Sequence, residues 1–250
     1  MGQGSRGRVE VWEDFMSMHD DSGLAIVDAD GLRWNDLRLN AISGDVTMDT
    51  IVTLGGGMAT FTGAGAAADG INIATSPFIP ADGQMWMECR FKYAAYADAR
   101  VFVGFAETVD RDEAVNPFTL SGTTLTVNNT GNTWGFYFDT GATTDDFRAA
   151  ASSAGVIKSA SGTLGVRANA TLTADKFVVI RVTIDQSGGG EAWMADTGSG
   201  EMKLVDTIPA GTLSTTAVYH PMAHLAANST GDELMTVDYF GAGGGRSWTP

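Results

Sequence analysis

The stretch between residues 84 and 107 limits the possible folds most, because its apolar residues recur at every second position. Met85, Met87, Cys89 and Phe91 are each followed by a tryptophan or a charged residue, and the alternation resumes after a polar turn at residues 101–105. A period of two places alternate side chains on opposite faces of a β-strand. Large apolar residues occur on both faces, which predicts that both are covered, as in two sheets packed face to face.

Short alternating runs of this kind continue along the chain, with turn residues about every 8–15 positions. The other predicted strands cover residues 9–15, 24–27, 32–39, 46–54, 58–62, 71–75, 134–139, 155–159, 164–168, 177–185, 191–195, 202–206, 218–227 and 234–240. Residues 108–133 are expected to form a long connection, and weak helical periodicity predicts one or two helical turns at 145–151. This pattern is typical of an all-β fold, a two-sheet antiparallel sandwich.

The domain organisation follows from length and from the absence of an internal linker. A chain of 250 residues fits one large β-domain. We expect a flexible N-terminal arm at residues 1–8, a single β-sandwich domain at 9–241 and a glycine-rich C-terminal tail at 242–250.

Composition narrows the partners and the compartment. Thirty acidic against 15 basic residues give a formal net charge of −15, which repels nucleic-acid phosphates and argues against DNA or RNA binding. The single cysteine, Cys89, cannot form an internal disulfide and fits a small core residue of a protein made in a reducing compartment. No apolar run is long enough to predict a membrane span, and the N-terminus lacks the apolar region of a secretory signal.

Two Asp-Thr-Gly tripeptides, beginning at Asp139 and Asp196, are the patterns closest to a catalytic motif. Aspartic proteases use two such loops, so that paired carboxylates share one proton and activate water. The interval between the two tripeptides is short for a complete lobe around each loop. Asp and Gly are also favoured turn residues between strands, and we interpret both tripeptides as turns.

Two further patterns mimic cofactor sites. His220 and His224 have the spacing of zinc ligands on a helix, but Pro221 and the surrounding apolar residues predict a strand and a bend, and His19 is distant in sequence. Residues 63–68 mimic a dinucleotide-binding loop, but a new strand follows at once instead of the helix that such a loop must open. We therefore predict no metal site and no cofactor.

Calcium is the ligand that remains open, because it binds the oxygen atoms of loop carboxylates and backbone carbonyls. The candidate carboxylates share a position in predicted loops, where a solvated turn residue is the simpler interpretation. They are Asp28, Asp30, Asp110, Asp112, Asp145, Asp146 and Asp232.

Sugar hydrolysis finds no support in the spacing of the carboxylates. Glycoside hydrolases of a similar fold align their carboxylates on one face of a strand, about 5 Å apart in retaining enzymes. The strand around Glu88 has one carboxylate, and the spacing of Glu10, Glu13 and Asp14 breaks the single-face rule. The six tryptophans could stack on sugar rings, but their scatter among strands favours packing within the protein: Trp12, Trp34, Trp86, Trp134, Trp193 and Trp248.

The order of the strands resembles the concanavalin A-like, laminin-G-like jelly roll. The segments that carry the resemblance span roughly residues 44–241 and are, in chain order, the strand at 85–92, VFVGFAE, WGFYFD, DKFVVIRVTID, a glycine-rich hairpin into EAWMAD, and VDYF. More narrowly, VFVGFAETVDRDEAVNPFTLSGTTLTV followed by WGFYFDTGATTDDFRAAASSAG resembles a group of tailed-bacteriophage virion proteins.

The narrower resemblance implies a non-enzymatic virion structural protein that decorates or cements a phage capsid. Its implied partners are the major capsid protein or another virion protein and further copies of itself, such as a trimer, and its implied location is the virion, assembled in the host cytoplasm. Contacts would come from the termini, with Arg6, Arg8, Trp12, Arg246 and Trp248 as the candidate interface residues. The alternative is a carbohydrate- or receptor-binding module of a phage fibre or tail, since the same fold displays loops that bind glycans.

Overall fold

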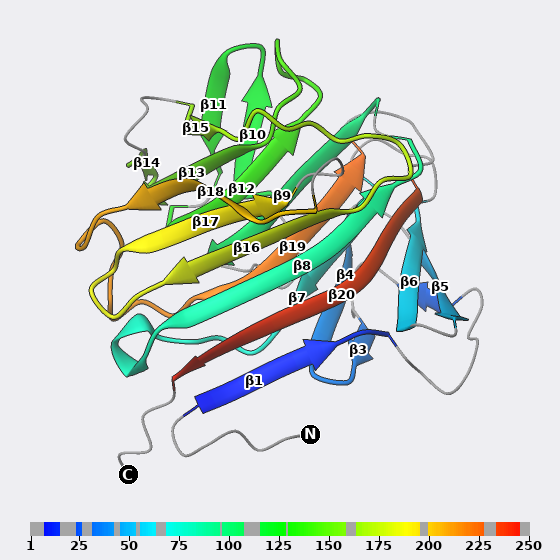
Figure 1. The fold of residues 1–250 in the computed structure, drawn as a ribbon, viewed down its shortest axis with the longest axis horizontal. Helices are drawn as coiled ribbons and strands as arrows, with labels where there is room; N and C mark the ends of the chain where they lie inside the picture. Colours follow the sequence, from blue (N-terminus) through cyan, green and yellow to red (C-terminus); the bar gives the residue numbers. More distant parts are fainter. Residues whose placement is uncertain are drawn as a thin grey trace.

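The computed structural model describes residues 8–15, 24–26, 32–42, 46–53, 56–63, 69–95, 97–107, 116–128, 130–158, 164–195, 200–227 and 234–245. Two large antiparallel sheets lie one behind the other in these residues, as Figure 1 shows, which confirms the predicted jelly-roll sandwich. The single helical element in the described residues is a short 3-10 turn, η1 (Pro80–Asp82). No helix in this part of the chain is long and apolar enough to cross a membrane.

The front layer in Figure 1, which we call sheet A, is built around the long strand β20 (Leu234–Gly245). The first half of β20 pairs with β6, and its second half pairs with β1. The order across the sheet is β18 (Lys203–Ile208), β17 (Gly190–Ala195), β16 (Val178–Ile184), β8 (Met85–Tyr93), β20, β6 (Gly56–Thr62), β5 (Val46–Thr53) and β2 (Leu24–Ile26), with β1 (Arg8–Glu13) beside β20.

The layer behind it, sheet B, has a matching number of strands. Their order is β14 (Val156–Ile157), β13 (Arg148–Ser153), β12 (Thr133–Asp139), β9 (Ala99–Ala106), β19 (His220–Ala227), β7 (Gly70–Ala74), β4 (Leu37–Ile42) and β3 (Leu32–Trp34), with β15 (Val166–Arg167) beside β13. A separate hairpin of β10 (Phe118–Ser121) and β11 (Thr124–Val127) completes the fold.

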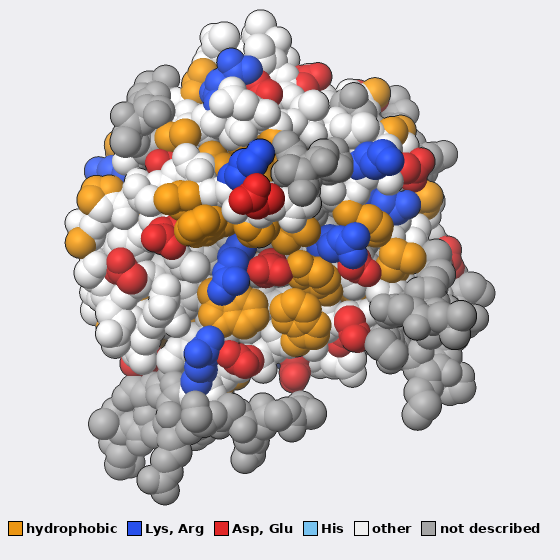
Figure 2. Space-filling view, viewed as in Figure 1, with side chains coloured by type: hydrophobic (Ala, Val, Ile, Leu, Met, Phe, Trp, Pro, Cys, Tyr) orange, Lys and Arg blue, Asp and Glu red, His pale blue; other side chains and the backbone are white. Residues whose placement is uncertain are grey.

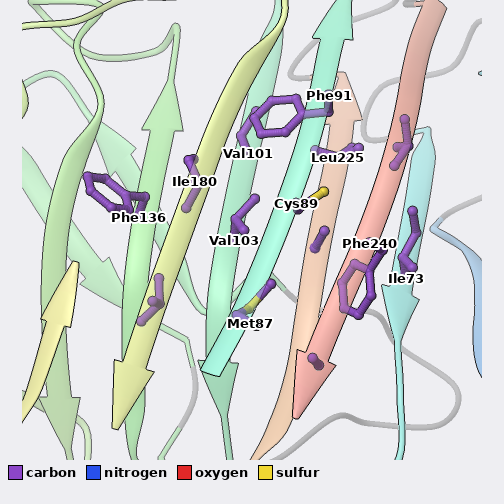
Figure 3. Close-up of a cluster of buried hydrophobic side chains, with 14 of the residues drawn as sticks. Ile73, Met87, Cys89, Phe91, Val101, Val103, Phe136, Ile180, Leu225 and Phe240 are labelled. Carbon is purple, nitrogen blue, oxygen red and sulfur yellow. The ribbon is translucent and has the colours of Figure 1, made fainter. Parts of the chain in front are cut away.

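The core between the sheets is made by the alternating residues of the opening stretch. Strands β8 and β9 are consecutive in sequence but lie in different sheets, so the chain crosses the sandwich between them. Cys89 and Phe91 of β8 are fully buried and lie in one cluster with Val101 and Val103 of β9 (Figure 3). Burial of each large apolar side chain contributes about 1.5–3 kcal/mol, so this layer is the main source of stability. The predicted core position of Cys89 is confirmed, and burial raises the pKa of its thiol.

The predicted covering of both faces holds for β9 but only partly for β8. Phe102 on the outer face of β9 is fully buried, with its ring centroid 5.8 Å from that of Phe118 in the β10–β11 hairpin. The outer residues of β8, from Trp86 to Lys92, are half-buried. One sheet is therefore covered on its outer face, whereas the other presents that face to solvent.

Five sequence-based predictions need correction. Residues 32–39 are not one strand, because a turn at Asn35–Asp36 splits them into β3 and β4, with Asn35 at a positive φ of 52° that asparagine tolerates. Residues 108–133 are not a plain connection, since they contain β10 and β11.

Residues 145–151 form no helical turn, because Arg148–Ser153 is a strand in which Ala149 and Ala151 pack into the main core. The glycine-rich tail does not start at residue 242 either. Strand β20 continues to Gly245, paired with β1 on one side and β8 on the other. Similarly, the predicted N-terminal arm loses its last residue, Arg8, to β1. Residues 1–7 and 246–250 lie outside the described part of the chain.

Candidate functional site

Aromatic side chains gather on the outer face of sheet A. Outward positions of this sheet hold Trp12 of β1, Tyr239 of β20 and Trp86 of β8, which are adjacent strands, and Trp193 of β17, which β16 separates from β8. We call this set the aromatic face. Figure 2 views this side of the molecule and shows hydrophobic side chains in a band among lysines, arginines and carboxylates. Trp12 is 56% exposed, the most exposed aromatic residue among the large hydrophobics that reach the surface of the described chain.

Two glycines make room for the indoles. Strand β20 alternates Phe240 and Ala242, which point into the core, with Gly241 and Gly243, which point outward. A Cβ atom on Gly241 would lie 2.5 Å from Cε3 of Trp12 and 3.2 Å from Cζ3 of Trp86. A Cβ on Gly243 would lie 2.6 Å from Nε1 of Trp86. Both indole rings therefore lie directly on the glycine backbone, and any larger residue would lift them from the sheet.

A stack of aromatic rings fixes the orientation of Trp12. Its ring centroid lies 4.8 Å from that of Tyr239, with an angle of 22° between the ring planes. Such stacked pairs contribute about 0.5–1.5 kcal/mol beyond the area that they bury. The exposed indole is therefore held in place before any ligand arrives, which reduces the entropy lost on binding.

Charged groups connect the aromatic rings to one another. The Tyr239 hydroxyl donates to Oε1 of Glu88 at 2.6 Å, and Nη1 of Arg181 lies 3.7 Å from Oε2 of the same carboxylate. The Arg181 guanidinium also lies over the Trp86 ring, 5.8 Å from its centroid. Burial and the hydrogen bond to Glu88 raise the pKa of Tyr239 above its ordinary value, so its hydroxyl remains a donor.

Further cations and aromatic rings flank this centre. The Arg90 guanidinium lies 4.2 Å from the centroid of Phe177, and its Nη1 lies 2.5 Å from Oδ2 of Asp238. On the other side, Nε1 of Trp193 donates to Oε2 of Glu191 at 3.2 Å. Flat rings bordered by fixed donors and acceptors can stack on the C–H face of a sugar ring while hydrogen bonding to its hydroxyl groups.

Of the predicted interface residues, Arg8 and Trp12 lie together on β1. Nε of Arg8 lies 2.9 Å from Oε1 of Glu10 in an exposed ion pair. Arg6, Arg246 and Trp248 lie outside the described residues.

The prediction that the tryptophans serve internal packing is right for Trp134 and wrong for the aromatic face. Trp134 is fully buried and donates from Nε1 to the carbonyl oxygen of Thr183 at 3.1 Å. Trp12, Trp86 and Trp193 instead share the outward face with charged residues. The sequence contains the signal, because Trp86 alternates in phase with Glu88 and Arg90, and Trp193 in phase with Glu191.

Asp139 has a structural role. It is buried at the end of β12, where Oδ2 accepts from Nε of Arg100 at 3.2 Å and from the amide of Leu120 at 3.1 Å, and Oδ1 accepts from the amide of Gly141 at 2.8 Å. These contacts fix the turn that follows the strand and attach β10 to sheet B, which agrees with the predicted turn. Asp196 lies outside the described residues.

The carboxylates near the N-terminus do not share one face of the strand, as their spacing predicted. Glu10 points outward on β1, whereas Glu13 is buried and accepts from the amide of Phe15 at 2.7 Å and from Nδ2 of Asn35 at 2.5 Å. Glu13 thus links β1 to the β3–β4 turn.

The histidines lie on a strand, as predicted. His220 and His224 both belong to β19 and face the outer side of sheet B. His224 is buried beside Asn72, and burial together with the nearby Arg100 lowers its pKa to about 3. Its imidazole is therefore neutral at ordinary pH. His19 lies outside the described residues.

Most of the calcium candidates lie outside the described residues, namely Asp28, Asp30, Asp110, Asp112 and Asp232. Asp145 is exposed, and Asp146 pairs with Arg167. In the part of the chain that the structure describes, no three His, Cys, Asp or Glu residues cluster as metal ligands.

Comparison with known proteins supports the fold. No protein-family model matches the chain, and no curated protein matches its sequence. Among solved structures, a protein of unknown function from Shewanella oneidensis MR-1 is 14% identical with a TM-score of 0.59, over 98% of this chain and 90% of that chain. Peanut lectin with a nine-residue peptide is 12% identical with a TM-score of 0.56, over 97% and 99% of the two chains.

A third similar structure is the carbohydrate recognition domain of Emp47p, which is 11% identical with a TM-score of 0.54, over 89% of this chain and 95% of that chain. At such low identity these likenesses establish a shared architecture and carry no residue-level correspondence. The chain therefore has the jelly-roll sandwich of lectin-like domains.

Proposed function

We propose that the protein is a non-enzymatic carbohydrate-binding module that holds sugar rings against the aromatic face. The single observation that carries the proposal is the exposed indole of Trp12, stacked on Tyr239 at 4.8 Å and lying on Gly241. Exposed aromatic residues on a rigid sheet contribute contact area at little cost in conformational entropy. Glu88 and Arg181, which lie between the rings, supply hydrogen-bond partners for hydroxyl groups.

The solved structures with a similar fold give this proposal additional support. They include peanut lectin and a carbohydrate recognition domain, so glycan binding is an activity that this architecture can host.

The experiment is a glycan-array screen of the whole protein, followed by calorimetric titration with the oligosaccharide that binds best. Truncation of a central aromatic residue at a binding site commonly costs 2 kcal/mol or more, so Trp12→Ala should weaken binding by at least about tenfold. Trp12→Phe should retain part of the affinity, because a flat ring remains.

Val156→Ala is the matched control. Val156 is also 56% exposed, but it lies on β14 of sheet B. Its substitution should leave the affinity unchanged. Equal affinities of the wild-type protein and Trp12→Ala would refute the role of the aromatic face. Repeating the titration with and without calcium decides whether loop carboxylates contribute.

Capsid decoration is the second candidate function. It is favoured by the position of β1, which pairs only with β20 among the described strands and so leaves one edge available to another chain. In this proposal the partner is a capsid protein, the chain assembles as a homo-oligomer such as a trimer, and its location is the virion. Deletion of residues 1–7 should lower its occupancy on purified shells, and unchanged occupancy would remove the arm from the mechanism.

A further inference from the structure

A pocket of about 280 Å³ lies at the edge of sheet B, away from the aromatic face. It is enclosed by the β3–β4 hairpin, the residues that follow β7, and the start of β19. Its lining residues are Arg33, Asn35, Asp36, Leu37, Arg38, Ala74, Thr75, Ser76, Pro77 and His220. The volume is near the lower end of the range of small-molecule sites, so the pocket fits a ligand of about monosaccharide size.

The arrangement of two arginines distinguishes this pocket. Arg33 and Arg38 are directly opposite each other in the β3–β4 hairpin, and both line the pocket. The Cβ atoms of such a pair lie about 4.5–5.5 Å apart, and like charges at these positions destabilise a hairpin. Among the described residues no ion pair joins Arg33 to a carboxylate. An anion between the two guanidinium groups would remove this repulsion.

The other polar groups of the pocket include one carboxylate. Nε of Arg38 donates to Oδ1 of Asn40 at 3.2 Å, which orients the guanidinium. Burial lowers the pKa of His220, and the nearby Arg38 lowers it further, although a hydrogen bond with the backbone of Thr75 acts in the opposite direction. Asp36 is the only carboxylate among the lining residues, against two guanidinium groups. The backbone carbonyl of Asp36 accepts from Oγ1 of Thr75 at 3.2 Å, which holds the turn against β7.

We propose that this pocket binds the oxyanion group of a small molecule between Arg33 and Arg38. The planar fork of a guanidinium matches the two oxygens of a carboxylate or a phosphoryl group, and Lys could not replace it with the same geometry. The net charge of −15 opposes anions over the molecule as a whole. Screening limits that repulsion to about 8 Å at physiological ionic strength, so the guanidinium groups next to the ligand decide whether the anion binds.

The site goes beyond the proposed carbohydrate-binding function, because it uses different residues on the other sheet. It can be tested by measuring the melting temperature of the whole protein with sodium glucuronate, glucose or sodium phosphate at constant ionic strength. In Trp12→Ala, which weakens any sugar binding on the aromatic face, glucuronate or phosphate should still raise the melting temperature, whereas glucose should not. A larger rise with glucuronate identifies a carboxylate ligand, and a larger rise with phosphate a phosphoryl ligand.

Arg33→Gln should weaken the binding of the effective anion by at least about tenfold. Without anion the same variant should be at least as stable as the wild-type protein, because the like-charge pair is gone. Arg33→Lys should give an intermediate affinity. Arg181→Gln on sheet A and Trp12→Ala should keep the full response to the anion, which separates this site from the aromatic face. The proposal is overturned if neither anion raises the melting temperature, or if Arg33→Gln responds as the wild-type protein does.

Discussion

The outer faces of the two sheets are built from the same alternating pattern but differ in their exposure to solvent. On sheet A, Trp12 is 56% exposed and the outward residues of β8 are half-buried. On sheet B, Phe102 and Tyr137 are almost completely buried. The ring centroid of Phe118 in the β10–β11 hairpin lies 5.8 Å from that of Phe102 and 5.6 Å from that of Tyr137. The covered face therefore serves stability, whereas the open face is available for binding.

The difference is encoded in the residues that alternate with the core positions. In β8 these are Trp86, Glu88, Arg90 and Lys92, which remain partly in water. In β9 the corresponding residues include Phe102 and Gly104, which a second apolar layer can cover. A run of charged residues in phase with an aromatic residue thus indicates an open face, as in β8. Phe102 is in phase with Gly104 and with a single charge, Arg100, which pairs with Asp139 at 3.2 Å, and its face is covered.

Truncation of the hairpin residue that packs on sheet B should give the largest effect. Phe118→Ala removes a fully buried ring from the second cluster and should lower the free energy of unfolding by about 3–5 kcal/mol. Urea denaturation of the wild-type protein and the variant measures the difference in the free energy of unfolding. A loss below about 1 kcal/mol would mean that the hairpin does not cover sheet B tightly.

The buried histidine of sheet B should make stability depend on pH. The pKa of His224 is lowered to about 3 in the folded protein. Between about pH 6.5 and pH 3 the imidazole is therefore neutral in the folded protein, whereas the same residue of the unfolded chain binds a proton. The contribution of neutral His224 to the free energy of unfolding is complete above pH 6.5. It is lost as the pH falls from 6.5 towards 3, by about 1.4 kcal/mol per pH unit at most.

His224→Gln is the matched variant for that measurement. In the difference in unfolding free energy between the wild-type protein and this variant, the pH-dependent contributions of the shared carboxylates cancel. The difference should shift in favour of the variant as the pH falls from 6.5 to 4. A difference that stays constant over this range would show that His224 is protonated in the folded protein.

On the open face, Trp12→Ala should change stability far less than Phe118→Ala does. About half of the indole is already in water, so the loss should be about 1 kcal/mol, mainly from the stack with Tyr239. The same urea titration compares the two truncations. A loss equal to that of Phe118→Ala would place Trp12 in the structural core and would contradict the comparison.

The smallest effect is expected at the rim of the open face. Glu10 and Arg8 form an ion pair whose side chains are 48% and 55% exposed. Glu10→Gln should therefore change the free energy of unfolding by less than about 0.5 kcal/mol, and added salt should remove even that. A larger loss that persists in high salt would show that β1 depends on this pair.

Much of the fold could be predicted from the sequence, because the residues of the two faces of a strand alternate along the chain. The strands around Cys89 and around residues 178–184 were found in this way. The strand Arg148–Ser153 was missed, since its alanines carry little β-preference and only the tertiary contacts of Ala149 and Ala151 select the strand. The β10–β11 hairpin was missed because β11 is short and largely polar.

The candidate site could be predicted only in part. Trp12 was identified as an interface residue, but from its place near the N-terminus. Its partner Tyr239 and the glycines beneath it lie more than 200 positions away, and the pairing of β1 with β20 brings them together. The opposition of Arg33 and Arg38 likewise depends on the turn at Asn35, which divided a segment predicted as one strand.

Everything proposed for the open face requires that ligands reach the outer side of sheet A, and the indole N–H signals of the tryptophans report on this contact. In a nitrogen–proton correlation spectrum, each indole is assigned by its Trp→Phe variant, and the oligosaccharide selected by the array is titrated in. The signals of Trp12, Trp86 and Trp193 should shift, while that of Trp134, buried and bonded to Thr183, should not. Shifts confined to Trp34 or Trp134, with the three signals of the aromatic face unchanged, would contradict the account.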